Sequence, residues 1–108
     1  MLKKANRLAK AKEIEAAFAR GRTFFNPFFT VKFLPSASKK QFTVVVSTKV
    51  YKNAVSRNRI KRILREHIRK NLGSFKTGSY VIITKPKISK LPEAESLAQF
   101  KEVVNKLR

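Results

Sequence analysis

The hydrophobic positions of this chain recur with two periods, one typical of helices and one typical of strands. Between residues 54 and 72 they follow a spacing of three and four, at Ile60, Ile63, Leu64, His67 and Ile68. Residues 29–33 instead alternate between apolar and polar side chains, and residues 41–48 are rich in β-branched side chains. The pattern therefore predicts one main amphipathic helix among strands.

Turn residues and helix-end signals delimit the remaining elements. A short helix should end before Gly21, and Pro92 with Glu93 favours the start of a last helix. The elements expected in chain order are a helix over 10–20, an aromatic extended segment over 22–34, a strand over 41–48, the main helix over 54–72, a strand over 79–84 and a helix from 92. This α-β-β-α-β-α order predicts an α+β sandwich with helices against a small sheet.

Length and charge narrow the class of protein. The 108 residues suit a single domain over 1–108, of which 1–9 form a basic lead-in that we expect to be flexible. Lysine and arginine number 26 against six acidic residues, a net charge of +20 that calls for a polyanionic partner. With 43% hydrophobic residues and nine phenylalanines the chain is not expected to be disordered. The polyanionic partner is therefore expected to be a nucleic acid or an anionic membrane surface.

Two further absences bear on location. No apolar run approaches the roughly 20 residues that a membrane-spanning helix needs, and no apolar segment of signal-peptide length follows the N-terminus. The chain also has no cysteine, which fits a reducing cytoplasm. We therefore expect a cytoplasmic protein with no membrane partner.

The inventory of reactive side chains argues against catalysis by the protein itself. The chain has no cysteine and no aspartate, and its one histidine, His67, lies on the apolar stripe of the main helix. A histidine there is more often a residue at the edge of the core than a catalyst. The glutamates at 13 and 15, and at 93 and 95, fall on different helix faces. We predict no catalytic and no metal-binding residue.

The side of the main helix opposite its apolar stripe is almost purely cationic. It carries Asn58, Arg59, Lys61, Arg62, Arg65, Arg69 and Lys70, with Glu66 as the one acid. A solvated polar face would be expected to mix signs and to pair glutamate with lysine at i, i+4. Six like charges instead favour phosphate binding, for which the arginine fork is well shaped.

A second candidate surface is the aromatic stretch, which holds five of the nine phenylalanines between positions 24 and 33. Core packing accounts for most of these rings. Because Arg20, Arg22 and Lys32 lie among them, stacking of one or two rings on single-stranded bases stays open as an alternative.

Residues 47–66, STKVYKNAVSRNRIKRILRE, carry a specific signature. This run resembles the protein component of bacterial ribonuclease P, whose motif is S-x-K at a strand end followed by A-V-x-R-N-R-I-K-R-x-x-R-E on a helix. The resemblance extends to Arg7-Leu8, Phe18 and Gly21, and in the order of elements to the C-terminus. The chain departs from the family at Ile14, where a phenylalanine is usual.

The resemblance implies a two-layer α-β-β-β-α-β-α sandwich with a small mixed sheet. The aromatic stretch would then form two strands, and the β-α-β crossover around the main helix would be left-handed, against the general rule. It also implies a subunit of an endoribonuclease that removes the 5′ leader from precursor tRNA. The catalytic centre and its Mg²⁺ would belong to the RNA, and the protein alone would be inactive.

The family's contact residues can be placed on this chain. The resemblance implies that the catalytic RNA is bound by Lys52, Arg57, Asn58, Arg59, Lys61, Arg62, Arg65 and Arg69. It implies a cleft between the first helix and the sheet for the leader, with Phe18, Lys32, Phe33, Ser47 and Lys49. The alternative function is a non-enzymatic basic RNA-binding protein, such as a ribosomal protein or an RNA chaperone. A basic membrane-surface module is disfavoured because the main helix hides its apolar stripe.

Overall fold

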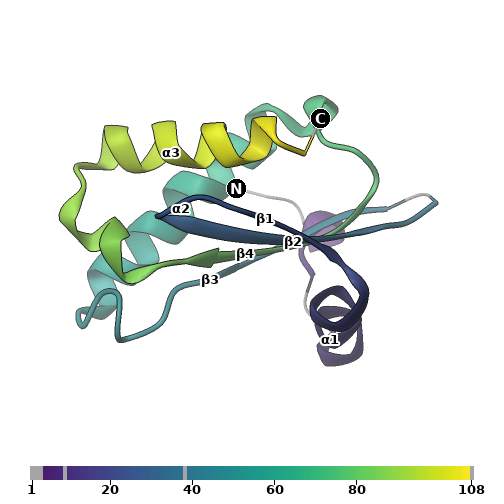
Figure 1. Cartoon of the computed structure of the whole chain (residues 1–108), viewed down its shortest axis with the longest axis horizontal. Coiled ribbons are helices and arrows are strands. Elements are labelled where there is room, and N and C mark those ends of the chain that lie inside the picture. The colour runs from purple at the N-terminus through teal and green to yellow at the C-terminus, as the bar shows by residue number, and fades with distance from the viewer. Residues whose placement is uncertain (1–3, 9, 38, 108) are drawn as a thin grey trace.

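A four-stranded sheet with helices on both faces forms the molecule (Figure 1). The computed structural model describes residues 4–8, 10–37 and 39–107. Its elements are α1 (Ala11–Arg20), β1 (Arg22–Phe25), β2 (Phe29–Pro35), β3 (Lys40–Val45), α2 (Ala54–Lys70), β4 (Gly78–Thr84) and α3 (Glu93–Asn105), with short 3₁₀ turns at Lys4–Asn6, Leu72–Ser74 and Pro86–Lys90. This is the α-β-β-β-α-β-α order that the resemblance implies, with one strand more than the residue pattern alone predicts.

The extra strand arises because Asn26 folds the aromatic stretch into a hairpin. Its side-chain oxygen accepts hydrogen bonds from the backbone N–H groups of Phe28 and Phe29, both at 2.9 Å, which is the local bonding of an Asx turn. Its amide nitrogen donates to the carbonyl of Gln99 on α3 at 2.9 Å. Because these bonds satisfy the buried amide, the turn is fixed and β1 pairs antiparallel with β2.

The strands lie in the order β1-β2-β4-β3. β2 pairs antiparallel with β4, whereas β3 runs parallel to β4 and is joined to it through α2. This mixed sheet confirms the expected fold class and contains the β-α-β crossover, whose left-handedness stays a prediction. β3 ends at Val45 and α2 at Lys70, both earlier than the sequence pattern predicts.

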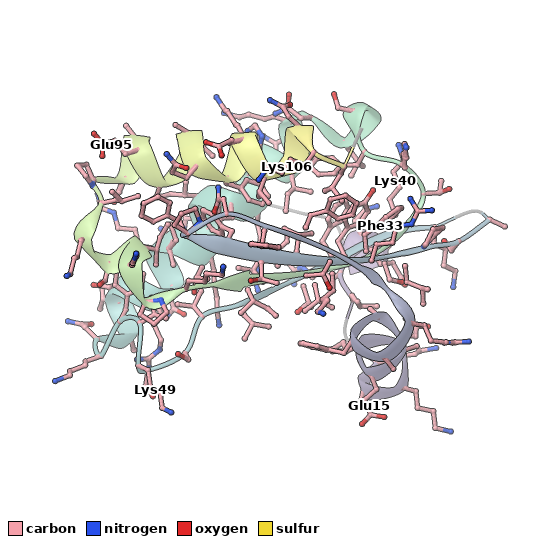
Figure 2. The ribbon with its side chains drawn as sticks, viewed as in Figure 1. Glu15, Phe33, Lys40, Lys49, Glu95 and Lys106 are labelled. Carbon is pink, nitrogen blue, oxygen red and sulfur yellow. The ribbon has the colours of Figure 1, made fainter. Side chains whose placement is uncertain are left out.

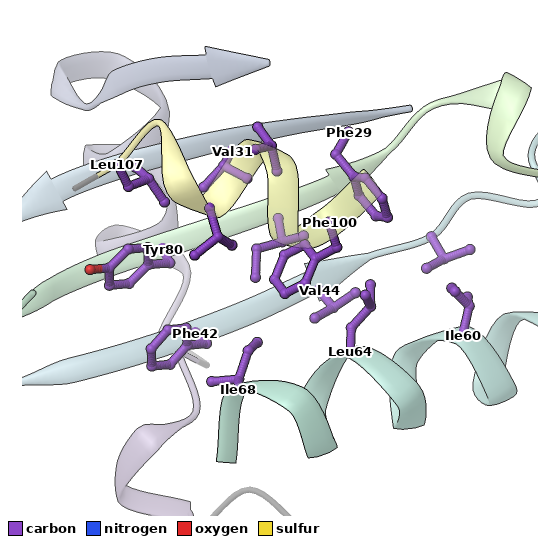
Figure 3. Close-up of a cluster of buried hydrophobic side chains, with 14 of the residues drawn as sticks. Phe29, Val31, Phe42, Val44, Ile60, Leu64, Ile68, Tyr80, Phe100 and Leu107 are labelled. Atoms are coloured by element: carbon purple, nitrogen blue, oxygen red, sulfur yellow. The ribbon is translucent and has the colours of Figure 1, made fainter. Parts of the chain in front are cut away.

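The main core lies between the sheet and the α2–α3 layer. Tyr80 of β4 stacks between Phe33 and Phe42 from the neighbouring strands, with ring centroids 4.7 Å apart in both pairs. Figure 3 shows Leu64 and Ile68 of α2 reaching toward these strands from one side. Burial of this many large side chains supplies the hydrophobic stabilisation that a highly charged chain needs.

The opposite face of the sheet carries α1 at one end only (Figure 1). Leu8, Ala17 of α1 and Val81 of β4 are buried together there, with Ile14 packed partly buried beside them. Since α1 is only ten residues long, no helix among the described residues covers the rest of this sheet face.

Part of the N-terminal segment lies against the edge of the sheet, and the expected flexibility of the lead-in over 1–9 stays a prediction. Arg7 forms a parallel β-bridge with Phe42 on the free edge of β3, and the Leu8 N–H donates to the Phe42 carbonyl at 2.8 Å. Asn6 donates to the carbonyl of Lys40 at 2.8 Å. Residues 6–8 are therefore docked, because they satisfy part of an otherwise unpaired strand edge. Positions 1–3 and 9 of the expected lead-in lie outside the described residues.

Among the helices that the structure describes, none combines the length and the apolar character needed to cross a bilayer.

Candidate nucleic-acid interface

α2 turns its cationic side outward by burying the other side against the sheet and α3. Ile60, Leu64 and Ile68 are buried, and Ile63 is half-buried. Asn53 caps the helix by accepting a hydrogen bond from the Val55 N–H at 2.7 Å. A helix fixed in rotation by its apolar stripe holds its charged side chains at set positions, which favours binding of a phosphate backbone.

The structure brings the predicted RNA-binding residues together along α2 and the turn before it. Lys52, Asn58, Arg59, Arg62 and Arg69 are exposed. Arg57, Lys61 and Arg65 are half-buried. The predicted set therefore forms one continuous surface, although its members differ in their contacts.

Arg57 differs most, because its guanidinium is bonded to the protein's own backbone. Its Nη1 donates to the carbonyls of Tyr51 and Lys52, both at 2.9 Å. Tyr51 in turn donates from its hydroxyl to the Ile88 carbonyl at 3.3 Å. Arg57 thus ties the connector before α2 to the first turn of the helix, a role that the sequence did not predict.

Two of the candidate arginines form surface ion pairs. Arg59 pairs with Glu93 at the start of α3. Arg69 binds Glu66 through two nitrogens, with Nη2 to Oε2 at 2.9 Å, and this contact lowers the pKa of Glu66 and raises the pKa of Arg69. Exposed pairs of this kind contribute little stability, so a phosphate can replace the carboxylate at small cost.

A groove of about 750 Å³ continues the cationic side of α2 toward α3. Arg62, Lys70 and Lys101 are among its lining residues, together with apolar side chains that include Ile63 and Val104. The groove therefore joins positive charge to an apolar lining beside the α2 surface.

His67 also lines this groove, and its contacts place it at the edge of the core. Its ring meets Phe100 edge-on with centroids 5.7 Å apart, and its Nδ1 lies 3.2 Å from the side-chain nitrogen of Asn71. Burial, and then the nearby charge of Lys101, lower the pKa of His67. In the part of the chain that the structure describes, no three histidine or acidic side chains group as they would around a metal ion.

The second predicted surface lies on the sheet face that α1 leaves open. Phe18 of α1 is 45% exposed, and Lys32 of β2 donates to the Thr23 hydroxyl at 2.6 Å. Ser47 and Lys49 are exposed in the connector that follows β3. Figure 2 shows Lys49 and Glu15 of α1 on the side of the sheet away from α3, near its two ends. The predicted residues are thus spread along one face rather than gathered at one point.

Phe33 does not belong to this surface. Its side chain is 6% exposed and stacks on Tyr80 in the main core. Successive side chains of a strand point to opposite faces, so Lys32 and Phe33 cannot both face α1. The implied role of Phe33 beside the leader is therefore wrong, and the ring is a core residue.

Two side chains that sequence reasoning missed, Val45 and Ile83, lie toward the open face together with Phe25, one of the rings of the aromatic stretch. Phe25, Ile83 and Val45 share a cross-strand row with Thr30, and Phe25 and Val45 are 60% and 40% exposed. Lys85 lies over the Phe25 ring at 5.0 Å from its centroid, a cation–π contact. Strand alternation counted outward from buried neighbours could have identified Val45 and Ile83. The strand pairing that aligns them could not have been found in the same way.

Comparison with known proteins decides the family. The sequence model of the Ribonuclease P family matches residues 2–108. The chain belongs to the ribonuclease P protein family. A ribonuclease P protein component from an Exiguobacterium species is 35% identical over 108 residues, which cover 99% of this chain and 94% of the relative. The component from Finegoldia magna is 41% identical over 81 residues, covering 74% of this chain and 70% of the relative.

Solved structures of ribonuclease P proteins share the fold. The Staphylococcus aureus protein matches with a TM-score of 0.88 at 22% identity, covering 94% of both chains. The Thermotoga maritima protein matches with a TM-score of 0.81 at 24% identity, covering 94% of this chain and 97% of that one. The resemblance read from residues 47–66 is therefore confirmed for the family and the fold. Ribonuclease P is favoured over a ribosomal protein or an RNA chaperone.

Proposed function

We propose that this protein is the protein subunit of a bacterial-type ribonuclease P, which docks on the catalytic RNA through α2 and holds the 5′ leader of precursor tRNA on the open sheet face. The observation that carries the proposal is the cationic side of α2, fixed by its buried stripe, in a chain of this family. The assembled enzyme would then cut the leader endonucleolytically to give the mature 5′ end of tRNA.

Docking through α2 is supported by the charges and their spacing. Lys61, Arg65 and Arg69 follow one another at four-residue intervals, and Arg62 lies beside them. Residues four apart are neighbours on a helix, so Lys61 and Arg65 repel each other and a phosphate would reduce this repulsion, whereas Arg69 is paired with Glu66 until a phosphate replaces the carboxylate. Arginine forks bind two phosphate oxygens at once, which gives orientation as well as affinity.

Leader binding is supported by the mixture of exposed side chains on the open face. Phe18 offers a ring on which a base can stack, and Val45 offers apolar surface nearer the connector. Lys32 and Lys49 supply charge for the phosphates that link the bases. Ile14 has no π face, so stacking on α1 depends on Phe18.

The chemistry of cleavage is assigned to the RNA and the Mg²⁺ ions that it binds. Those ions would stabilise the charge that develops on the phosphodiester oxygens. The protein's part is to screen phosphate repulsion between two RNAs and to hold the leader in position. The one histidine suits no catalytic role, because it packs against Phe100 in the α2–α3 layer. We place this assembly in the cytoplasm, as the cysteine-free composition suggests.

Reconstitution tests the proposal. The protein alone should cleave no precursor tRNA, and added to a bacterial ribonuclease P RNA at low Mg²⁺ it should restore removal of the 5′ leader. The measurement is the initial rate of leader release, with RNA alone as the baseline. No gain over RNA alone would overturn the proposed function.

A charge-matched pair of variants separates specific docking from bulk charge. The double variant Arg59→Ala with Arg62→Ala should lose most of the increase in the rate of leader release that the wild-type protein gives over RNA alone. Lys87→Ala with Lys90→Ala removes two exposed cations that belong to the Pro86–Lys90 turn and not to α2, and this variant should keep most of the rate gain. Equal losses would mean that α2 acts only through net charge.

A further inference from the structure

The groove between α2 and α3 is lined by side chains that recur at helical spacing on both helices. On α2 Ile63 and His67 lie four residues apart, and on α3 Leu97, Lys101 and Asn105 follow one another at the same interval. Residues four apart share one side of a helix, so each wall is a continuous stripe. At 1.5 Å per residue the α3 wall is about 12 Å long. The groove volume of about 750 Å³ also falls within the range of about 300–1,000 Å³ that is typical of ligand sites.

The groove carries a net positive charge. Arg62 and Lys70 line it from α2 and Lys101 lines it from α3, and all three side chains are exposed. Among the described lining residues the one acid is Glu66, whose carboxylate is bound by two nitrogens of Arg69. Because this carboxylate is already compensated, the groove favours an anionic occupant.

Four of the lining side chains are apolar. Ile63 and Leu97 are half-buried on the two walls, and Phe75 and Val104 are buried. Apolar side chains contribute to binding when an apolar group of the ligand takes the place of water against them. The occupant should therefore combine an apolar surface with nearby negative charge. A nucleotide of a single-stranded RNA segment has both, in its base and in the phosphates on either side of it.

His67 adds a hydrogen-bond donor whose tautomer is set by Asn71. The Asn71 side-chain nitrogen donates to the His67 carbonyl at 2.9 Å and lies 3.2 Å from His67 Nδ1. Because this amide nitrogen can only donate, Nδ1 is the acceptor and the neutral ring carries its proton on Nε2. Burial, and then the charge of Lys101, lower the pKa of His67 and so favour the neutral ring. A ring N–H can donate to a base edge or to a phosphate oxygen.

We propose that the α2–α3 groove binds an unpaired nucleotide of the catalytic RNA, with its base against the apolar lining and its phosphates at Arg62, Lys70 and Lys101. The proposal rests on the proposed function and extends the RNA-binding surface from α2 to α3, beyond the signature over 47–66. A double-stranded segment keeps its bases stacked inside the duplex. A groove that joins cations to apolar walls therefore favours a base turned out of pairing.

A single introduced cysteine can locate the groove on the RNA, because the natural chain has none. Asn105→Cys places the cysteine in the groove at the end of α3. Glu95→Cys is the matched control, since Glu95 is exposed near the start of the same helix (Figure 2). With an iron–EDTA probe on the cysteine, Asn105→Cys should cut a bound bacterial ribonuclease P RNA within a few consecutive unpaired nucleotides. Glu95→Cys should cut those nucleotides far less.

Removal of a cation and removal of the base test the two parts of the site separately. Lys101→Ala should weaken RNA binding about threefold to tenfold and lower the salt dependence by about 0.7 of a slope unit, as expected for one phosphate of a single strand. Lys87→Ala removes an exposed lysine from the Pro86–Lys90 turn and should change both far less. An RNA made abasic at the mapped nucleotide should bind the wild-type protein about tenfold more weakly. Because Lys101 is exposed, its loss should leave the thermal unfolding temperature unchanged.

Three results would each overturn the groove site. These are cleavage from Asn105→Cys that is absent or as scattered as that from Glu95→Cys, equal losses for Lys101→Ala and Lys87→Ala, and an abasic RNA that binds as tightly as the intact one. Absent cleavage would leave the groove to a protein partner instead. If the wild-type protein restores cleavage of precursor tRNA while any of these is found, only the groove site fails. If the wild-type protein gives no gain in cleavage, the proposed function fails with it.

Discussion

The half-buried ring of His67 lies between α2 and α3 and meets Phe100 edge-on. The sequence predicted such a core-edge role from its place on the apolar stripe. What the sequence did not contain is the neighbouring charge of Lys101 from α3, which acts with burial to lower the pKa of His67 below its ordinary value of 6.5. The neutral ring is therefore the form that the folded protein favours.

This shift predicts a pH dependence of stability. As the pH falls below about 6.5, the unfolded chain binds a proton that the folded protein resists, so the free energy of unfolding should decrease until the folded pKa is passed. His67→Gln should flatten this dependence. Urea unfolding of both proteins between about pH 5.5 and 7.5 measures it, because ordinary carboxylates stay largely ionised there. Parallel curves for the two proteins would contradict the assignment.

α2 combines two kinds of arginine that the sequence does not distinguish. Arg57 and Arg62 both belong to the signature run, and each falls among positively charged neighbours. The guanidinium of Arg57, however, donates to two backbone carbonyls, whereas Arg62 is exposed beside the α3 groove. The element therefore divides its cations between holding its own N-terminal connector and facing a partner.

The division predicts opposite effects for two similar substitutions. Arg57→Ala should lower the free energy of unfolding by about 1–2 kcal/mol, since the half-buried Tyr51 carbonyl and the exposed Lys52 carbonyl lose a charged donor. Arg62→Ala should leave stability within about 0.5 kcal/mol and weaken binding to ribonuclease P RNA. Chemical denaturation and RNA binding at fixed salt measure the two effects. A destabilised Arg62→Ala with a normal Arg57→Ala would reverse the interpretation.

At the scale of the whole molecule, the sheet separates two candidate RNA surfaces. The α2 surface lies with α3 on one face, and Phe18 projects from α1 on the other. A charge of +20 on 108 residues can therefore serve two RNA segments at once, with different side chains toward each.

Because the two surfaces lie on opposite faces of the sheet, a substitution on the Phe18 side should impair leader binding alone. Phe18→Ala should weaken binding of precursor tRNA by about 1–3 kcal/mol, as expected for a lost base stack, and should leave mature tRNA nearly unaffected. Because Phe18 is exposed, its loss should cost the fold little. Binding of the two tRNAs to the reconstituted enzyme measures the difference. Equal losses for precursor and mature tRNA would remove Phe18 from the leader surface.

Local patterns in the sequence determined much of this protein. The stripe through Ile60, Leu64 and Ile68 predicted the orientation of α2, because helical periodicity is set by the backbone alone. The signature over residues 47–66 predicted the family, and net charge predicted a polyanionic partner. These properties depend on residues close together in the chain or on their sum.

Only the tertiary structure decided how distant residues meet. The strand order β1-β2-β4-β3 placed Val45, Ile83 and Phe25 in one open row and buried Phe33 on the other side. Pairing of Arg7 with Phe42 placed the N-terminal segment along the β3 edge, far from it in the sequence. Such contacts depend on strand pairing and on which face each helix covers. These follow from the free energy of packing the whole chain, which no single stretch of sequence encodes.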